Sequence, residues 1–499
     1  MGIIQKQAIK GTVYTYIGAF LGLINVVILF PRILSTDEIG LINILLAYAM
    51  VLSQFGSLGF NSATTRMFTY FKTDDNKHNG FLFLNLIVSL VGFLLVLGVF
   101  MLLKPILLSN NDNADSSQLL FKYFFYIVPL LFFTLFFNAF DHYNKVLFNA
   151  VRGTFLREFV PKVLILIVII LYVFDFLNFS QFVFSYVCAF CSPSVIIMIL
   201  LIKDKQFNLR PNFKFLTKDM KKTLLSVSLF GIITSAIGIV ILNIDRIMIE
   251  RMLGLSSAGI YATSFFFGTF IILPARSLNK ISSAVISDSW KNNDIENINK
   301  IYYKSTLTQL IIGSFLLIGI WGNIDNIIIL MTEKFEAGRY VILFVSLAFF
   351  TDMASGVSSA ILTNSKKYRI QAVFLIIMIL LLISANFILI QKYHIVGAAI
   401  ALFISKFIFN LIKYFYLWYR FKLQPFDYRS LLVIIIAISV YGITYLIPEF
   451  ELFYIDIIVR SSAITLLFGV LIFSFKISED INNGFIEYLH KLMSIFNKK

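Results

Sequence analysis

Long apolar runs, separated by short polar segments, follow one another along the whole chain. Each run has about 20 residues, the length that a helix needs to cross a hydrocarbon layer about 30 Å thick. The runs are continuously apolar and do not alternate with period two, so they predict helices and not the strands of a β-barrel. The predicted spans lie near 11–30, 40–61, 81–103, 120–140, 160–177, 180–202, 224–244, 258–275, 301–321, 339–361, 370–391, 396–419, 431–447 and 455–475.

The composition supports this interpretation. Of the 499 residues, 59% are hydrophobic and 14% are charged, whereas a soluble chain is about 45–50% apolar and about 25% charged. We therefore expect an all-α membrane protein with about 14 transmembrane helices and no sizeable soluble domain. The first run, 11–30, continues without the small-residue cleavage site of a signal peptide and is predicted to be the first span.

The formal net charge is +15, and the cations lie in short loops between the spans. This distribution is a topology signal, because cytoplasmic loops carry the excess of Lys and Arg. Without a basic domain to hold a duplex, no nucleic-acid partner is expected. The cation-rich segments are the N-terminus, 62–80, 141–159, 203–223, 276–300, 362–369, 420–430 and the C-terminal tail. Both termini are therefore predicted to be cytoplasmic, while 104–119 and 448–454 are predicted to face outward.

The basic linker 203–223 divides the spans into two blocks of six, followed by an extra pair. The blocks share a motif, since PRILSTDEIGLINILLAYA begins at Pro31 and ERMLGLSSAGIYATSFFFG begins at Glu250, with Gly40 in register with Gly259. Six spans separate the copies, which therefore have one orientation, as in a parallel repeat. The predicted architecture is an N-lobe 1–202, a cytoplasmic linker 203–223, a C-lobe 224–419, a helix pair 431–475 and a cytoplasmic tail 476–499.

Ionisable residues inside the predicted spans are few. A charge at mid-bilayer costs about 2.5 kcal/mol or more, so each one is a functional candidate. In the twelfth span Lys406, Asn410 and Lys413 are spaced i, i+4, i+7, which places them on one helix face. Lys413 is near enough to the cytoplasmic end to extend toward water, so a role as an interfacial lysine stays open. Lys406 lies deeper and is predicted to face a cavity.

Two more spans place polar residues toward the cytoplasmic side. The second span carries Gln54 and Asn61 at helical spacing, with Arg66 beside the stripe, and this polar face suggests a wet groove. The eighth span, in the corresponding place of the second block, is followed by Arg276 and Lys280, one turn apart. Contact with substrate and a purely topological role are both open for these three cations.

Two intramembrane acids are candidates for ion coupling. Asp245 precedes Arg246, which can neutralise it, whereas Asp352 in the tenth span has no charged neighbour in the sequence. An unpaired intramembrane Asp can carry a coupling proton, so the proton hypothesis is placed on Asp352.

Several motifs with known chemistry are missing. The sequence contains neither the phosphate loop G-x-x-x-x-G-K-[ST] nor H-E-x-x-H. Cys188 and Cys191 have C-x-x-C spacing, but they lie in the middle of an apolar run, which favours core packing over a redox or metal role. No metal and no cofactor are predicted. Any transport has to draw on an ion gradient, the membrane potential or the substrate's own gradient.

The stretch PRILSTDEIG after the first span, together with NIDRIMIERMLGLSSAGIYA after the seventh, resembles the bacterial polysaccharide transporters. These are the Wzx-type flippases of lipid-linked oligosaccharides, in the superfamily that also holds multidrug and toxin extruders and lipid II flippases. The resemblance covers nearly the whole chain, and the plan of six, six and two spans agrees with it.

The resemblance implies a V-shaped pair of six-helix lobes that gives alternating access to a central cavity. It also implies a bacterial inner-membrane location and a substrate of undecaprenyl-diphosphate-linked sugars, for O-antigen, capsule or a related glycan. Membrane lipids and the glycan polymerase and ligase machinery are the implied partners. Cationic cavity residues suit a diphosphate because they donate charge-assisted hydrogen bonds. The positions that fit this role by location are Arg66, Arg276, Lys280 and Lys406.

Three other functions stay open. A cation-coupled multidrug exporter is expected to carry a conspicuous acidic site in an N-lobe span, and none is evident. A glycan polymerase or lipid-linked glycosyltransferase is expected to need a large outer loop with acidic or metal-binding residues, whereas the longest predicted outer loops, 104–119 and 322–338, have roughly 16 residues each. A membrane scaffold needs no intramembrane cations, whereas this sequence places Lys406 inside a predicted span. Because each alternative lacks an expected feature, the flippase is the preferred hypothesis.

Overall fold

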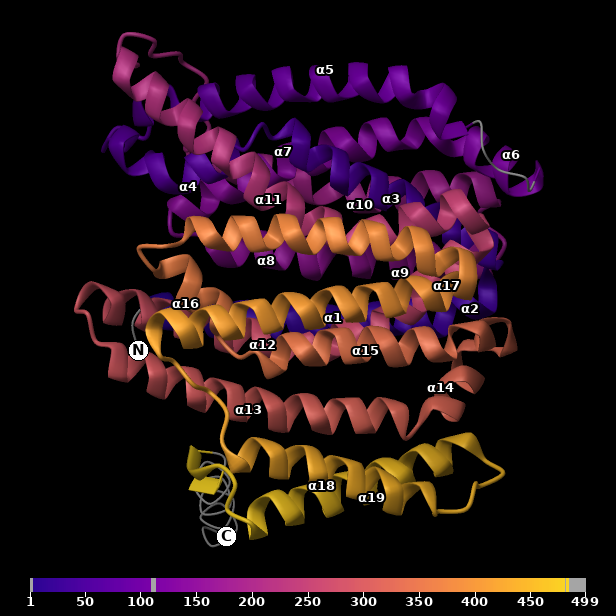
Figure 1. Cartoon of the computed structure of the whole chain (residues 1–499). Coiled ribbons are helices and arrows are strands. Elements are labelled where there is room, and N and C mark those ends of the chain that lie inside the picture. The colour runs from indigo at the N-terminus through magenta and orange to yellow at the C-terminus, as the bar shows by residue number, and fades with distance from the viewer. Residues whose placement is uncertain (1–2, 109–113, 481, 484–499) are drawn as a thin grey trace, which may run out of the picture. The chain divides into compact units, whose positions relative to one another are not determined.

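A computed structural model describes residues 3–108, 114–480 and 482–483 (Figure 1). The regular elements in these ranges are helices, which confirms the predicted all-α class. Part of the predicted outer segment 104–119 and most of the predicted tail 476–499 lie outside the described residues.

The helices of the first half, with the π-helix η1 and the short 3₁₀ turns η2 and η3, are α1 (Ile3–Leu23), η1 (Ile24–Leu29), α2 (Phe30–Ile33), α3 (Thr36–Gly56), α4 (Phe60–Phe71), η2 (His78–Gly80), α5 (Phe81–Leu108), α6 (Ala114–Tyr123), η3 (Phe124–Tyr126), α7 (Ile127–Val146), α8 (Ala150–Glu158), α9 (Val160–Val173) and α10 (Phe179–Lys203). Those of the second half are α11 (Lys218–Leu253), α12 (Leu255–Lys291), α13 (Ile295–Trp321), α14 (Ile324–Met331), η4 (Glu333–Gly338), α15 (Arg339–Ala354), α16 (Ser358–Asn364), α17 (Arg369–Phe421), α18 (Tyr428–Tyr445) and α19 (Phe453–Ser474).

Twelve helical segments of the described chain are long and apolar enough to cross a membrane. Two helices account for the difference between these twelve segments and the fourteen predicted spans. α9 has 14 residues and falls short of a full span. α17 has 53 residues and contains one non-helical residue, His394, with φ 51° and ψ −134°, where two predicted spans meet. The membrane-spanning fold is confirmed, while the count of fourteen stays a prediction.

Local backbone and side-chain structure marks the two ends of α3. The Ser35 hydroxyl accepts from the backbone N–H of Glu38 while the Glu38 carboxylate accepts from the N–H of Ser35, a capping box that begins α3. α3 then ends at Gly56, and Leu58 and Gly59 adopt positive φ before α4 begins. The prediction that the second span carries its polar stripe on one continuous helix is therefore wrong, because the chain turns at 57–59.

The chain divides into two compact units. Unit 1 consists of Met1–Thr263 and Ile379–Ala398, and unit 2 consists of Ser264–Met378 and Ala399–Lys499. α11, which was predicted to open the C-lobe, clusters with unit 1. The functional lobes 1–202 and 224–419 stay a prediction, and the units are described separately below.

Unit 1 has an aromatic core to which part of the basic linker is attached. Phe68, Phe71 and Phe81 are buried at the junction of α4 and α5. Phe215 of the linker lies against Phe71, with the ring centroids 5.1 Å apart. The Asn212 side chain also donates a hydrogen bond to the Asn79 side chain, at 3.1 Å. The segment between α10 and α11 is therefore anchored to unit 1 by both apolar and polar contacts.

The two copies of the repeated motif meet inside unit 1. A side chain at Gly40 would collide with the carbonyl of Leu255 and approach the N–H of Gly259. A side chain at Gly259 would collide in the same way with the carbonyl of Thr36 and the N–H of Gly40. These reciprocal contacts join residues that the repeat places in register, and the missing side chains let the two helices approach closely.

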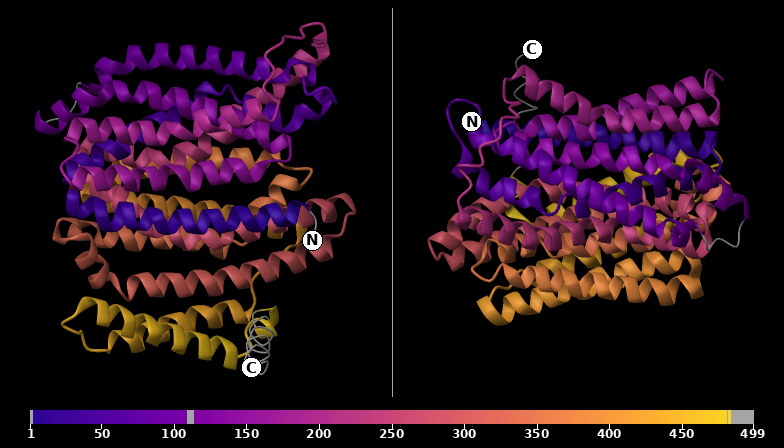
Figure 2. Two further views of the ribbon diagram at one scale, coloured as in Figure 1. Left: turned by 180° about the vertical axis from the view of Figure 1, so that it is seen from behind. Right: turned by 90° about the horizontal axis from the view of Figure 1, so that it is seen from above.

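Unit 2 has a core that α13 forms with α15, α18 and α19. Val433, Ile436 and Val440 are buried on one face of α18, as their helical spacing predicts. α18 and α19 run side by side as a helical hairpin at the C-terminal end of the described chain (Figures 1 and 2). The loop 446–452 joins them and belongs to a pocket described below.

Candidate functional site

A polar cluster in unit 2 forms where α17 packs against the end of α15. Lys406 forms an ion pair with Asp352, and Asn410 donates a hydrogen bond to the same carboxylate at 2.9 Å. Only 5% of Lys406 is exposed, and its ammonium group lies 4.3 Å from the ring centroid of Phe349. A buried cation needs such partners, because unpaired charge is costly in an apolar environment. The assumption that Asp352 is unpaired is therefore wrong.

Lys413 occupies the same face of α17 but has a different set of partners. It donates a hydrogen bond to the Ser359 hydroxyl at 3.0 Å and lies over the Phe409 ring, 4.5 Å from its centroid. It is 2% exposed, and no described carboxylate lies within ion-pair distance of it. Asp352 is thus the counter-ion of Lys406, while Lys413 is an excess positive charge.

A pocket of about 270 Å³ opens beside this excess charge. It is lined by Lys413, Asp352, Ser359 and Asn279, with further residues from α12, α15, α16 and α17, and we call it the Lys413 pocket. Gly356 makes it possible, because its φ of 53° breaks the chain between α15 and α16. Backbone at this break lines a cavity, which is where irregular structure is tolerated inside a membrane.

The other predicted cavity residues are not among those that line this pocket. Arg276 and Lys280 are exposed on α12, and Arg66 is exposed on α4 in unit 1. Asn61 is buried in α4. The structure therefore brings Lys406, Asn410 and Lys413 together, as predicted, while a shared site for all the predicted cations stays a prediction.

Gln54 lines a pocket of about 370 Å³ in unit 1, together with Arg157 and Lys162, and we call it the Gln54 pocket. Arg157 forms an ion pair with Asp141 at 2.8 Å, and Lys162 forms one with Glu158 at 3.0 Å. Sequence analysis missed both cations. Lys162 lies inside the predicted span 160–177 and could have been found there, whereas Arg157 was assigned to a loop.

Asp245 is buried in unit 1 with neutral donors on both carboxylate oxygens. Tyr261 donates to Oδ2 at 2.8 Å, and Asn386 donates to Oδ1 at 2.7 Å. Glu250, five residues along α11, is also buried and accepts from the Tyr48 hydroxyl at 3.4 Å. Sequence analysis treated Glu250 only as part of the repeat motif. Whether either acid takes part in ion coupling stays a prediction.

The described residues contain no group of three or more His, Cys, Asp or Glu side chains that could hold a metal ion. Cys188 is exposed and Cys191 buried, and neither forms a disulfide. The polar groups that line the two pockets are cations, amides, hydroxyls and the carboxylates of Asp352 and Glu158.

Residues 5–286 match the family described as "Polysaccharide biosynthesis protein". The chain belongs to this family. It is also 21% identical over 188 residues to a capsular polysaccharide biosynthesis protein, CapF, of Staphylococcus aureus, a match that covers 38% of this chain. The match spans about half the length of that relative, 47%.

Solved structures of other members of this fold cover nearly all of the chain. A lipid II flippase, MurJ, in an inward closed conformation has a TM-score of 0.74 at 15% identity, covering 94% of this chain and 100% of its own. A multidrug resistance MATE transporter of the MOP superfamily, in an inward-facing conformation, has a TM-score of 0.64 at 12% identity, covering 83% and 98%. At these identities the likeness shows the fold. The predicted resemblance to Wzx-type flippases is confirmed, and the family and fold are those of transporters.

Proposed function

We propose that the protein moves lipid-linked oligosaccharide units, joined to the lipid through a diphosphate, from the cytoplasmic to the outer leaflet of the bacterial inner membrane. Membership of the polysaccharide biosynthesis family and the named role of the capsular relative support the substrate class. The glycan is an O-antigen, capsule or related unit, and its next users are a polymerase and a ligase. Both termini face the cytoplasm.

The excess positive charge of Lys413 is the observation that carries this proposal. Its neighbours Lys406 and Asp352 neutralise each other, so the Lys413 pocket keeps one uncompensated cation among membrane-spanning helices. An anionic diphosphate compensates that charge with charge-assisted hydrogen bonds, which are shorter and stronger than neutral ones. An organic cation, the cargo of the alternative multidrug function, is repelled by the same charge.

Transport by this protein uses alternating access and no ATP hydrolysis. The sequence has no phosphate loop to bind a nucleotide. Asp352 and Asp245 stay the two candidates for ion coupling, and Asp352 is also the counter-ion of Lys406.

A translocation assay with purified protein in liposomes tests the proposal. The substrate is a polyprenyl-diphosphate oligosaccharide with a fluorescent sugar, and an impermeant quencher reports the leaflet that it occupies. Wild type is expected to translocate it without ATP. Lys413→Met is expected to slow translocation about 10- to 150-fold, which corresponds to the loss of about 1.5–3 kcal/mol from a charged hydrogen bond.

Two control variants separate charge from folding. Lys413→Arg keeps the charge and is expected to keep most of the activity, while Lys392→Met removes an exposed cation from the same helix and is expected to have no effect. A requirement for ATP, or equal rates for Lys413→Met and Lys392→Met, would show the proposed function to be wrong.

A further inference from the structure

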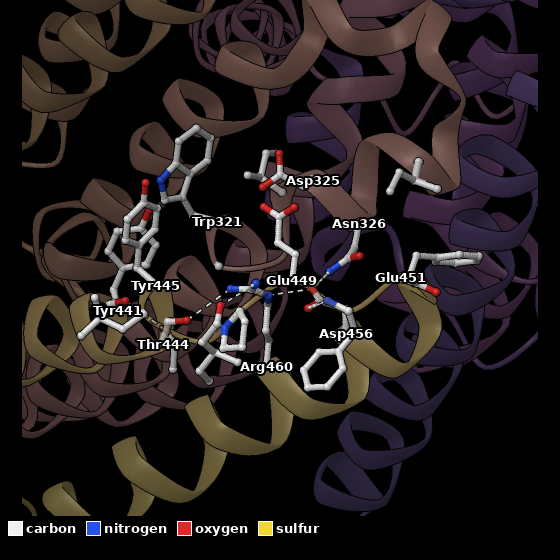
Figure 3. Close-up of a pocket in the computed structure, with 18 of the residues that line it drawn as sticks. Trp321, Asp325, Asn326, Tyr441, Thr444, Tyr445, Glu449, Glu451, Asp456 and Arg460 are labelled. Atoms are coloured by element: carbon white, nitrogen blue, oxygen red, sulfur yellow. Dashed lines mark hydrogen bonds and ion pairs between the residues drawn. The ribbon is translucent and has the colours of Figure 1, made fainter.

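A pocket that carries no role in the proposed function lies in unit 2, at the loop end of the α18–α19 hairpin. Its volume is about 580 Å³, within the range of about 300–1,000 Å³ typical of small-molecule sites. The loop 446–452, the segment after α13 and the starts of α14, α15 and α19 line it. We call it the Glu449 pocket (Figure 3).

A buried polar network holds the floor of this pocket. Arg460 forms an ion pair with Asp456 at 2.6 Å and donates to the carbonyl oxygens of Thr444 and Ile447, at 3.2 and 3.0 Å. Asn326 donates to the same Asp456 carboxylate from α14. These groups satisfy one another and fix the loop between α18 and α19. They therefore build the pocket and do not need a ligand to complete them.

Other acidic groups on the lining do not have such partners. Glu449 and Glu451 have no hydrogen bond or ion pair with any residue that the structure describes. In Figure 3 the side chains of Glu449 and Asp325 point into the pocket above Arg460. Asp325 is partly neutralised by Arg339, which also binds Glu336. The pocket thus offers free carboxylate acceptors next to guanidinium donors.

Aromatic rings form the opposite side of the same pocket. Trp321, Tyr441 and Tyr445 lie together there, and the two tyrosine ring centroids are 6.3 Å apart (Figure 3). Aromatic residues are common at membrane interfaces without binding anything. What distinguishes these three is that they face carboxylates across a hollow, so one ligand can touch an apolar ring face and charged acceptors together.

The net negative charge of the Glu449 pocket restricts the class of ligand that it can bind. Four carboxylates line the pocket against two guanidinium groups, so a phosphate or another anion is repelled. The described residues form no metal-binding group of acids. A sugar fits the remaining chemistry, because its hydroxyls donate to carboxylates and accept from arginine, while its C–H faces lie on aromatic rings.

We infer that the Glu449 pocket binds a saccharide, by stacking on Tyr445 and Trp321 and by hydrogen bonds from sugar hydroxyls to Glu449. The identification of the occupant as the exported glycan rests on the proposed function, in which residues 448–454 face outward. The inference that the occupant carries many hydroxyl groups rests on the residues that line the pocket. Because the pocket repels anions, it holds the sugars of the cargo and leaves the diphosphate outside.

Binding of a lipid-free sugar tests the inference. The probe is the oligosaccharide that mild acid releases from the polyprenyl-linked pool of the producing cells, so it carries neither phosphate nor lipid. Replacing Trp290 and Trp418 by Phe leaves Trp321 as the one tryptophan of the three in the chain. A saturable change in its fluorescence on titration is the expected result.

Matched variants locate the site. Tyr445→Ala and Glu449→Gln are expected to weaken binding at least tenfold. Tyr454→Ala and Glu333→Gln are the controls, an exposed tyrosine and an exposed glutamate outside the pocket, and they are expected to bind as wild type does. No saturable change, or equal losses in variants and controls, overturns the inference. So does a response to tetramethylammonium but not to the sugar, which identifies an organic-cation site.

The outcome is independent of the translocation assay. The lipid-free probe lacks the diphosphate that Lys413 is proposed to bind, so Lys413→Met is expected to leave its affinity for the Glu449 pocket unchanged. If translocation depends on Lys413 but the sugar does not bind, the inference fails and the proposed function stands. If the sugar binds in the Glu449 pocket but no translocation occurs, the proposed function fails and the saccharide site stands.

Discussion

The Lys413 pocket and the Glu449 pocket belong to one unit but have opposite charge. Asp352 near the end of α15 lines the first, and Arg339 at its start lines the second. Thirteen residues of helix separate them, which is roughly 20 Å at 1.5 Å per residue. One pocket has an excess cation among membrane-spanning helices, and the other has excess carboxylates at a loop. The diphosphate of the proposed substrate would therefore be attracted at one pocket and repelled at the other.

The two pockets also differ in how their ion pairs are supported, and the largest expected effect tests this difference. Asp352→Asn leaves the buried Lys406 without its counter-ion. We expect the stability of the protein to fall by about 3–5 kcal/mol, the cost of breaking a buried pair from one side. Thermal unfolding in detergent measures it.

The double variant Asp352→Asn/Lys406→Met removes both charges and is the control. It is expected to recover most of the lost stability, because no uncompensated cation remains. The single variant Lys406→Met completes the comparison. If the losses of stability in Asp352→Asn and Lys406→Met add up to the loss in the double variant, the pair is not coupled and Lys406 is stabilised by other groups.

The ion pair under the Glu449 pocket is expected to be less sensitive. Arg460→Met leaves Asp456 with two donors, the Asn326 side chain and the N–H of Phe450. We expect a loss of about 1.5–3 kcal/mol, the range for hydrogen bonds to a charged group, measured by the same unfolding transition. A loss larger than that of Asp352→Asn would contradict the comparison.

Reversing one charge makes the two pockets more alike. Glu449→Lys places a cation at a pocket that otherwise repels anions, so the variant is expected to retain the diphosphate of the proposed substrate; in water a charge pair at 4 Å is worth about 1 kcal/mol. Translocation in liposomes is expected to slow about fivefold, and raising the salt concentration is expected to restore the rate because salt screens exposed charges. Glu333→Lys, outside the pocket, is the control. A slow rate that salt does not change would point to a folding defect instead.

Cysteine labelling tests whether the Glu449 pocket faces outward. In a background without Cys188 and Cys191, a cysteine at Glu451 is expected to react with an impermeant maleimide added outside intact cells. A cysteine at Lys214 in the basic linker is expected to react only after the membrane is opened. The reverse pattern would place the Glu449 pocket on the cytoplasmic side and would contradict the outward position proposed for 448–454.

The sequence was most informative about features that depend on the residues of a single helix. The apolar runs predicted the helices because helices and closed barrels are the structures that satisfy the backbone in lipid, and the runs lack the period-two alternation of barrel strands. The spacing of Lys406, Asn410 and Lys413 predicted their shared face because residues i, i+4 and i+7 lie on one side of a helix. The partner of that face, Asp352, lies 54 positions from Lys406, and no local pattern reports a contact of that separation.

The sequence was least informative where a helix is interrupted. The turn at 57–59 and the break at Gly356 occur inside apolar runs that look continuous, and they are set by tertiary packing. The Glu449 pocket was missed for a related reason. Its acids were counted in the topology of the loop, whereas its aromatic wall belongs to predicted spans, and only the fold brings the two together.

The reciprocal contact between Gly40 and Gly259 joins two segments that the ribosome synthesises at well-separated times. The hydrogen bond beside it, between the hydroxyls of Thr36 and Ser256, joins residues 220 positions apart. At about 5–20 residues per second, the ribosome makes the second residue roughly 10–45 s after the first. This contact of α3 can therefore form only after α4 to α11 have been translated, whereas the contacts of α3 with α5 and α7 can form earlier. A nascent chain that stops before Leu255 lacks the residues that complete the contact with Gly40.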